Sequence, residues 1–176
     1  MRYIPMAMFT ALVALLLFLL MVPHGRNETF TPKPLPPLSV KPISGTTPWQ
    51  QKQLLGKVTV INFFASWCMP CAAEMPEMVA LKKQVPAVRF VGIAWNDEPK
   101  TIDRWLTEHG KPFHSVWTDT NGDATIALGV RGIPETLIVD GKGVVRYRLS
   151  GPLTEPVRKA TVEPLLKQLL AENHAH

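Results

Sequence analysis

The sequence contains little cysteine: Cys68 and Cys71 are the only two in 176 residues. This count excludes a framework of several disulfides, and a chain of this length buries enough core to fold without such bridges. A zinc site would need two further ligands, but there is no second Cys-x-x-Cys and the histidines are scattered. We therefore interpret the pair as a redox couple, with an inert bridge and half of a zinc site as the alternatives.

The sequence also lacks any long run of charges of one sign. The formal net charge is +5, from 19 basic and 14 acidic residues, and no block of like charges occurs. A nucleic-acid-binding protein would show a clustered basic stripe. We therefore expect no nucleic acid among the partners, and the length favours one domain with short additional segments.

Long apolar runs are absent except at the N-terminus, where residues 3–23 carry no charge and residues 11–22 are continuously apolar. A membrane-spanning helix needs about 17–25 apolar residues, whereas the apolar region of a cleaved signal peptide spans about 7–15 and ends at a small-x-small site. This run ends in Met-Val-Pro-His-Gly, a poor cleavage site. We predict that residues 1–23 are an uncleaved membrane anchor, with a cleaved signal peptide as the alternative.

An anchor of this kind implies export. Arg2 and Arg26 flank the apolar run almost equally, and the N-terminal amine favours a short cytoplasmic end. The rest of the chain would then lie outside the cytosol and its reducing pool. Residues 24–48 are dense in proline, which fixes φ and removes donors, so we predict an extended, semi-rigid spacer rather than core. The folded domain is expected over residues 49–176.

From residue 49 onwards, strand-like and helix-like patterns alternate. Residues 58–65 are β-branched and aromatic and follow a Gly-Lys pair, which is typical of a buried strand. Further strands are predicted over residues 88–95, 136–139 and 144–149, and helices over residues 70–84, 100–109, 124–128 and 157–171. This order indicates an α/β fold with a mixed central sheet and helices on both faces.

The cysteines lie where the first strand meets the first helix, in the string Trp-Cys-Met-Pro-Cys. Residues i and i+3 of a helix lie on one face about 5–6 Å apart, which is within reach of a disulfide. The positive end of the helix stabilises a thiolate and lowers the pKa of the first cysteine. Cys68 is therefore the expected nucleophile, and Cys71, one turn later and facing the sheet, the expected resolving thiol. A strand that leads into Cys-x-x-Cys at a helix start is typical of a thioredoxin-like motif.

A second informative string is Gly-Val-Arg-Gly-Ile-Pro-Glu-Thr, residues 129–136. Pro134 directly precedes a strand and cannot donate a hydrogen bond to the sheet, so it needs a special position. The string resembles the cis-proline loop of thioredoxin-fold proteins. This resemblance implies a cis Ile133–Pro134 peptide beside the cysteines, with the Ile133 backbone pairing with an extended substrate. It places Trp67, Ile133 and Pro134 at the substrate-binding surface.

Three strings together carry a closer resemblance: WCMPCAAEMP, GIAWND and LGVRGIPETLIVDGKGVVRYRLSGPL. Over roughly residues 49–170 the chain resembles the membrane-anchored thiol:disulfide proteins of cytochrome c biogenesis, of the DsbE/CcmG type. The Pro-Glu-Thr-Leu-Ile-Val-Asp-Gly segment and the Arg-Tyr-Arg-x-x-Gly that follows are more specific than Cys-x-x-Cys. The anchor and the proline-rich segment fit the same family.

The resemblance implies a thioredoxin-like fold and a thiol:disulfide oxidoreductase on the periplasmic side of the bacterial inner membrane. Its substrate would be apocytochrome c, or the maturation protein that holds its thiols, and a transmembrane electron donor would reduce it again. No haem, flavin or metal cofactor is implied. A general reductase of exported proteins is the nearest alternative. A non-catalytic metal-binding or assembly scaffold is the alternative of another class.

The family's active site is acidic, and its motifs place these acids at Glu74 and Glu135. A negative charge near Cys68 raises the pKa of its thiol, whereas a nearby base accepts a proton from Cys71. A simpler interpretation is also open. Glu74 falls in the first helical turns, where acids are favoured anyway, and Glu135 would be a solvated loop residue.

Two positions depart from the expected pattern. Asn62 stands six residues before the first cysteine, where many thioredoxins carry a buried aspartate that helps to deprotonate the resolving thiol. An amide cannot exchange a proton at neutral pH, so this task would fall on Glu74, Glu135 or water. Arg131 stands where the family often has tyrosine, and a cation there would favour a thiolate.

Overall fold

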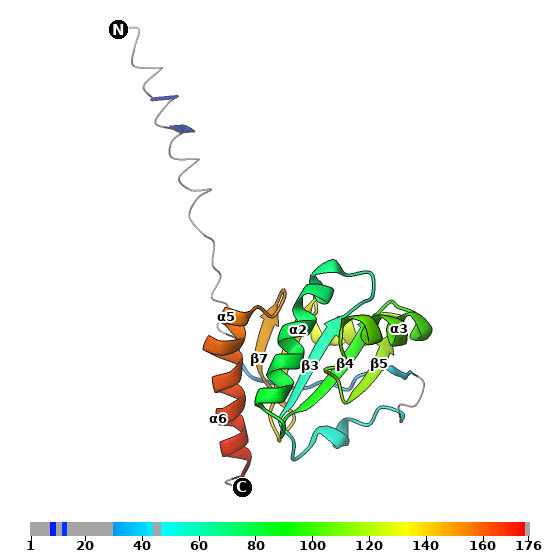
Figure 1. The fold of residues 1–176 in the computed structure, drawn as a ribbon. Helices are drawn as coiled ribbons and strands as arrows, with labels where there is room; N and C mark the ends of the chain where they lie inside the picture. The colour runs from blue at the N-terminus through cyan, green and yellow to red at the C-terminus, as the bar shows by residue number, and fades with distance from the viewer. Residues whose placement is uncertain (1–7, 10–11, 14–29, 44–46, 175–176) are drawn as a thin grey trace, which may run out of the picture.

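The computed structural model describes residues 8–9, 12–13, 30–43 and 47–174. In this part of the chain, strands β1 to β7 form one sheet in the order β1-β7-β6-β3-β4-β5-β2. The strands are β1 (Lys33–Pro34), β2 (Lys41–Pro42), β3 (Thr59–Phe64), β4 (Arg89–Trp95), β5 (Ser115–Asp119), β6 (Glu135–Val139) and β7 (Val144–Ser150). The helices are η1 (Gln51–Leu54), α2 (Met69–Gln84), α3 (Pro99–His109), α4 (Asp123–Leu128), α5 (Glu155–Val157), η2 (Arg158–Val162) and α6 (Glu163–His174) (Figure 1).

The predicted mixed sheet is confirmed. Strands β3, β4 and β5 run parallel, while β6 and β7 pair antiparallel with their neighbours. Every predicted strand and helix is present, with ends that differ by a few residues. The prediction omitted β5, a five-residue strand between α3 and α4 whose last four residues are buried. A run this short, without clear alternation of polar and apolar residues, gives only a weak strand signal.

Alternation along β3 divides the core between the two faces of the sheet, since successive side chains of a strand point to opposite sides. Val60 and Phe64 belong to a cluster with buried residues of α2, α3 and α6. Ile61 and Phe63 belong to a second cluster with buried residues of α4 and of the N-terminal segment. Figure 1 shows α2 and α3 in front of the sheet. We call the two sides the α2 face and the α4 face.

The proline-rich segment differs from its prediction. Its extended Lys-Pro pairs form β1 and β2, which pair with β7 and β5 at the two edges of the sheet. Leu35 and Leu38 are buried in the core of the α4 face. The prediction of a spacer outside the core is therefore wrong for residues 33–43. Proline is compatible with an edge strand, where its missing N–H leaves no ladder bond unmade.

The predicted anchor, residues 1–23, lies outside the described residues except for positions 8–9 and 12–13. None of the helices in the described part of the chain is long and apolar enough to cross a membrane.

The predicted closing helix is divided into α5, the π-helical turn η2 and α6. Arg158 in η2 is almost fully buried and ties this helix to α2. Its Nε donates to Glu77 Oε2 at 2.7 Å, and its Nη1 pairs with Glu163. Both charges of a buried pair need such partners, because an unpaired buried charge is strongly destabilising.

Candidate active site

Cys68 and Cys71 are joined in a disulfide at the start of α2, with their Cα atoms 5.3 Å apart. Cys68 is the N-cap residue of the helix, and its Sγ accepts a hydrogen bond from the Cys71 N–H at 3.2 Å. Cys68 retains 6% of its surface exposed, whereas Cys71 has none. An N–H at a positive helix end stabilises a thiolate on the first cysteine. The first sulfur is thus the one that a substrate can reach.

The loop before Cys68 is held by the loop after β4. The Ser66 N–H and hydroxyl donate to the two carboxylate oxygens of Asp97 at 2.5 and 3.1 Å. The Trp67 indole N–H donates to the Asn96 carbonyl at 3.3 Å. Asn96 has a φ of 47°, a left-handed conformation that asparagine tolerates better than most residues. Residues 95–97 therefore hold the segment that directly precedes Cys68 in place. The sequence alone did not predict this contact.

Apolar side chains lie exposed next to the disulfide. Trp67 is 58% exposed and Met69 84% exposed. The Trp67 ring lies 6.1 Å from that of Trp95, in a tilted arrangement. Exposed aromatic and methionine side chains gathered in one place are typical of surfaces that bind other proteins.

The Ile133–Pro134 peptide is cis. Pro134 is buried, and its carbonyl accepts a hydrogen bond from the Gly151 N–H at 2.9 Å. Ile133 is half-buried and packs against the core cluster that contains both cysteines. The structure thus brings this loop to the same region as the disulfide.

Glu74 is buried on the α2 face, one helical turn after Cys71. Its Oε1 accepts from Asn62 Nδ2 at 2.9 Å, and its Oε2 accepts from the Leu153 N–H at 2.7 Å. Burial raises the pKa of Glu74 to about 7, although these two hydrogen bonds partly oppose the rise. A carboxyl with a pKa near neutrality can both give up and take a proton at neutral pH. An acid placed only to favour the start of the helix would not need this property.

Asn62 connects Glu74 to the neighbouring strand. Its Nδ2 also donates to Thr136 Oγ1 at 3.0 Å, and Asn62 and Thr136 are directly paired between β3 and β6. Its Oδ1 is buried and has no hydrogen-bond partner among the described residues. Asn62 cannot take the proton itself, but it fixes the carboxyl that can. Alternation along β3 places this residue on the α2 face, and that signal was present in the sequence.

Glu135 lies on the α4 face, away from Glu74. It is paired in the sheet with Phe63, which belongs to the core of that face. The Glu135 carboxylate pairs with Arg148, and Ser150 Oγ donates to it at 3.4 Å. Burial raises the pKa of Glu135, while the Arg148 charge and the Ser150 hydroxyl oppose the rise. Glu135 is thus a buried, paired residue at the start of β6 and not a solvated loop residue.

Arg131 is exposed in the loop before Ile133. Its backbone and its charge both act on Glu135 and lower the pKa of that carboxyl, by less than burial raises it. Among the residues that the structure describes, no three His, Cys, Asp or Glu side chains are grouped so that they could hold a metal ion.

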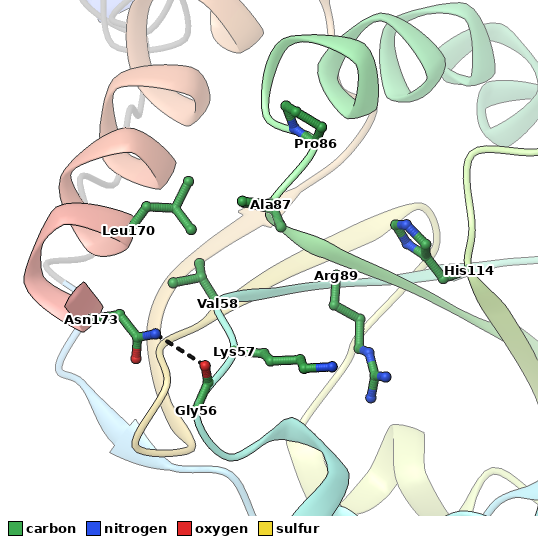
Figure 2. A pocket seen from close by; sticks show the side chains of 10 residues that line it. Gly56, Lys57, Val58, Pro86, Ala87, Arg89, His114, Leu170 and Asn173 are labelled. Carbon is green, nitrogen blue, oxygen red and sulfur yellow. Dashed lines mark hydrogen bonds between the residues drawn. The ribbon is translucent and has the colours of Figure 1, made fainter.

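A surface cavity of about 290 Å³ lies at the opposite end of the central strands from the disulfide (Figure 2). Its lining comes from residues that open β3 and β4 or precede β5, whereas Cys68 follows the far end of β3. The lining residues include Lys57, Arg89 and His114, and burial lowers the pKa of His114. Figure 2 shows Asn173 of α6 closing one side through a hydrogen bond to the Gly56 carbonyl. This cavity is separate from the disulfide.

A dithiol pair at a helix start, next to a cis-proline loop on a mixed α/β sheet, defines a thiol:disulfide oxidoreductase with a thioredoxin-like fold. The chain belongs to the Redoxin family, whose sequence pattern matches residues 33–166. The match begins at β1, in agreement with the placement of the proline-rich segment in the sheet.

Relatives and solved structures agree with this assignment. The chain is 34% identical over 145 residues to the thiol:disulfide interchange protein HelX of Rhodobacter capsulatus, covering 82% of this chain and 81% of HelX. It is 31% identical over 177 residues to the thiol:disulfide interchange protein DsbE of Escherichia coli, covering 96% and 95%. A thioredoxin-family thiol:disulfide interchange protein from Chlorobium tepidum is 30% identical, with a TM-score of 0.64 over 80% of this chain and 98% of that one.

Proposed function

We propose that this protein is a membrane-tethered dithiol reductant that acts on apocytochrome c, or on the protein that holds its thiols, before haem attachment. One observation carries the proposal: Cys71 is fully buried one helical turn from Glu74, whose pKa is about 7. A resolving thiol close to such a base suits the release of a reduced substrate. The choice of substrate is supported by the sequence resemblance, and the apolar N-terminal run supports a periplasmic domain tethered to the inner membrane.

The proposed reaction passes two electrons to the substrate. The Cys68 thiolate attacks one sulfur of the substrate disulfide, a mixed disulfide forms, and the other substrate sulfur leaves as a thiolate. Glu74 takes the proton of Cys71, whose thiolate then attacks the Cys68 sulfur. The second substrate thiolate leaves and the Cys68–Cys71 disulfide forms. A dithiol electron donor in the membrane then reduces this disulfide.

The remaining site residues bind the substrate in this proposal. The Ile133 backbone, held in place by Pro134, pairs with an extended segment of the substrate beside the disulfide. The exposed Trp67 ring, with Met69, contacts apolar side chains next to the substrate cysteines. Both contacts act before any bond is exchanged and hold the reacting sulfurs in line.

The nucleophile is tested by trapping. The Cys71→Ser variant keeps Cys68 and lacks the thiol that releases the substrate, so it should accumulate a covalent adduct with an oxidised peptide containing a Cys-x-x-Cys-His segment. Mass spectrometry of the intact protein detects this adduct. The Cys68→Ser variant is the matched control and should form none. Absence of an adduct with Cys71→Ser would show that the nucleophile is assigned wrongly.

The biological role is tested in cells by deleting the gene and measuring c-type cytochrome content. We expect a loss that exogenous thiol restores. Normal cytochrome levels would instead favour a general reductase of exported proteins. Complementation with Cys68→Ala separates the scaffold alternative, because a scaffold would still function without the cysteine whereas a reductant would not.

A further inference from the structure

The Arg-Tyr-Arg segment of β7 has no part in the reaction above, although its sequence is distinctive. Its second arginine, Arg148, is mostly buried and pairs with Glu135. Its Nη2 donates to the Leu128 carbonyl at 2.5 Å, and its Nη1 donates to the Gly129 carbonyl at 3.3 Å. One guanidinium therefore contacts three acceptors from two separate segments.

These acceptors lie at the two ends of a single loop. Leu128 and Gly129 are at the end of α4, and Glu135 is the first residue of β6. The residues between them include Ile133 and Pro134. We propose that Arg148 is a positioning residue that clamps both ends of this loop and so holds the Ile133 backbone in place for the substrate. The proposal rests on the proposed pairing of Ile133 with substrate.

The chemistry of the guanidinium suits this task. Arginine carries five N–H donors in a planar fork, which can serve a carboxylate and two carbonyls at once. The last carbonyls of a helix lack partners within the helix, and a cation near them is favourable. Lysine has one compact ammonium group on a flexible stem and cannot reproduce this arrangement.

The surroundings of Arg148 strengthen its contacts. Glu135 is buried, so its charge needs a partner in place of water. The guanidinium carbon also lies 6.0 Å from the centre of the Phe30 ring, and Phe30 packs against the core of the α4 face. An aromatic face at this distance attracts a cation. Phe30, in the segment before β1, thus adds a further contact to Arg148.

The first test measures the loop without any substrate. The Gly129 and Val130 amides donate to the Ile126 and Thr125 carbonyls, at 3.0 and 2.9 Å, and their hydrogen exchange reports whether this end of the loop is held. The Arg148→Met variant should exchange these amides at least about tenfold faster than the unmodified protein. Arg146→Met is the matched control, because Arg146 lies on the same strand and pairs with Asp140 and Glu172 instead. It should leave both amides unchanged.

The second test compares two substrates of the reduced protein. We expect Arg148→Met to slow reduction of a disulfide-bonded peptide about tenfold, since a misplaced binding group costs rate. Reduction of hydroxyethyl disulfide, too small to need the loop, should change less than about twofold. Equal slowing of both substrates, or unchanged amide exchange, would overturn the proposal. Faster exchange with no loss for the peptide would retain the clamp and reject the pairing of substrate with Ile133.

Two further variants cover the case in which Arg148→Met does not fold. The double variant Arg148→Met/Glu135→Gln removes the buried unpaired charge together with its partner, so it should fold and still exchange Gly129 and Val130 quickly. Arg148→Lys keeps a cation near Glu135 and should also lose amide protection. If either variant protects the two amides as well as the unmodified protein does, the clamp is wrong.

Discussion

At the scale of single residues, the two acids of the site have different environments. Glu74 shares the α2 face with the cysteines and bonds to Asn62 and Leu153, while Glu135 shares the α4 face with Arg148. Only Glu74 has a pKa raised to about 7 with no cation paired to it. We therefore propose that Glu74, and not Glu135, takes the proton of Cys71, and that Glu135 holds the loop that contains Pro134.

The Glu74 carboxyl should make stability depend on pH. Its pKa is about 7 in the folded chain and near 4.5 when unfolded, so between these values the folded state binds the extra proton. Stability therefore falls as the pH rises through this range, by roughly 3 kcal/mol if Glu74 acts alone. In Glu74→Gln this loss should be absent. Urea unfolding of the disulfide-bonded protein at pH 5 and pH 8 measures the difference.

A neutral substitution elsewhere provides the comparison for this measurement. Glu108 is exposed on α3, and Glu108→Gln should keep the pH dependence of the unmodified protein. If Glu74→Gln and Glu108→Gln show the same dependence, the carboxyl of Glu74 is not the group that titrates near neutrality.

At the scale of elements, the site is built where the parallel strands end. The loops after β3 and β4 lie at the same end of the sheet, because parallel neighbouring strands have their carboxyl ends side by side. The first loop leads to Cys68 and the second contains Asp97, which bonds to Ser66. Contact between these loops fixes the segment before the disulfide, which no single element could do.

Removing this contact should loosen the approach to the cysteines. Asp97→Ala leaves the half-buried Ser66 amide without its acceptor, so we expect a loss of about 1–3 kcal/mol in unfolding free energy. Asp103→Ala is the control, since Asp103 is exposed on α3 and should stay within about 0.5 kcal/mol of the unmodified protein. Urea denaturation compares the two variants, and equal stabilities would contradict the role of Asp97.

At the scale of the whole molecule, the N-terminal segment completes both edges of the sheet. Strands β1 and β2 extend it on opposite sides, and the residues between them cross the α4 face with Leu35 and Leu38 buried. Edge strands with unpaired N–H and C=O groups invite unwanted pairing, and short proline-containing strands limit it. The segment that leads out of the predicted anchor is therefore part of the folded domain.

The contribution of this segment is measurable through one leucine. Leu35→Ala should lower the unfolding free energy by about 2–3 kcal/mol, because it removes a side chain that is only 4% exposed. Leu55→Ala is the matched control, since Leu55 is 57% exposed and its loss should cost less than about 0.5 kcal/mol. A Leu35→Ala protein as stable as the Leu55→Ala protein would show that the segment adds nothing to the core.

Local patterns were sufficient for most of the elements. The β-branched run at residues 58–65 and the Pro70 helix start produced β3 and α2 as predicted, because burial and helix geometry agree there with local preference. The pattern failed for β5 and for residues 33–43. Both are short, and both become strands through pairing with segments that are distant in the sequence. Strand β5 pairs with β4 and β2. Of the two Lys-Pro pairs, β1 pairs with β7 and β2 pairs with β5.

The sequence by itself determined the redox pair, since two cysteines three residues apart at a helix start fix their own spacing through helix geometry alone. The Ile133–Pro134 loop and both acids were marked by the resemblance of their motifs to a known family. Only the tertiary structure decided which acid lies with the cysteines. The face of Glu135 depends on the register of β6 against β3, and the place of Glu74 depends on how α2 packs on the sheet. The same holds for the Arg148 contacts, which join β7 to the end of α4 through packing that no local pattern encodes.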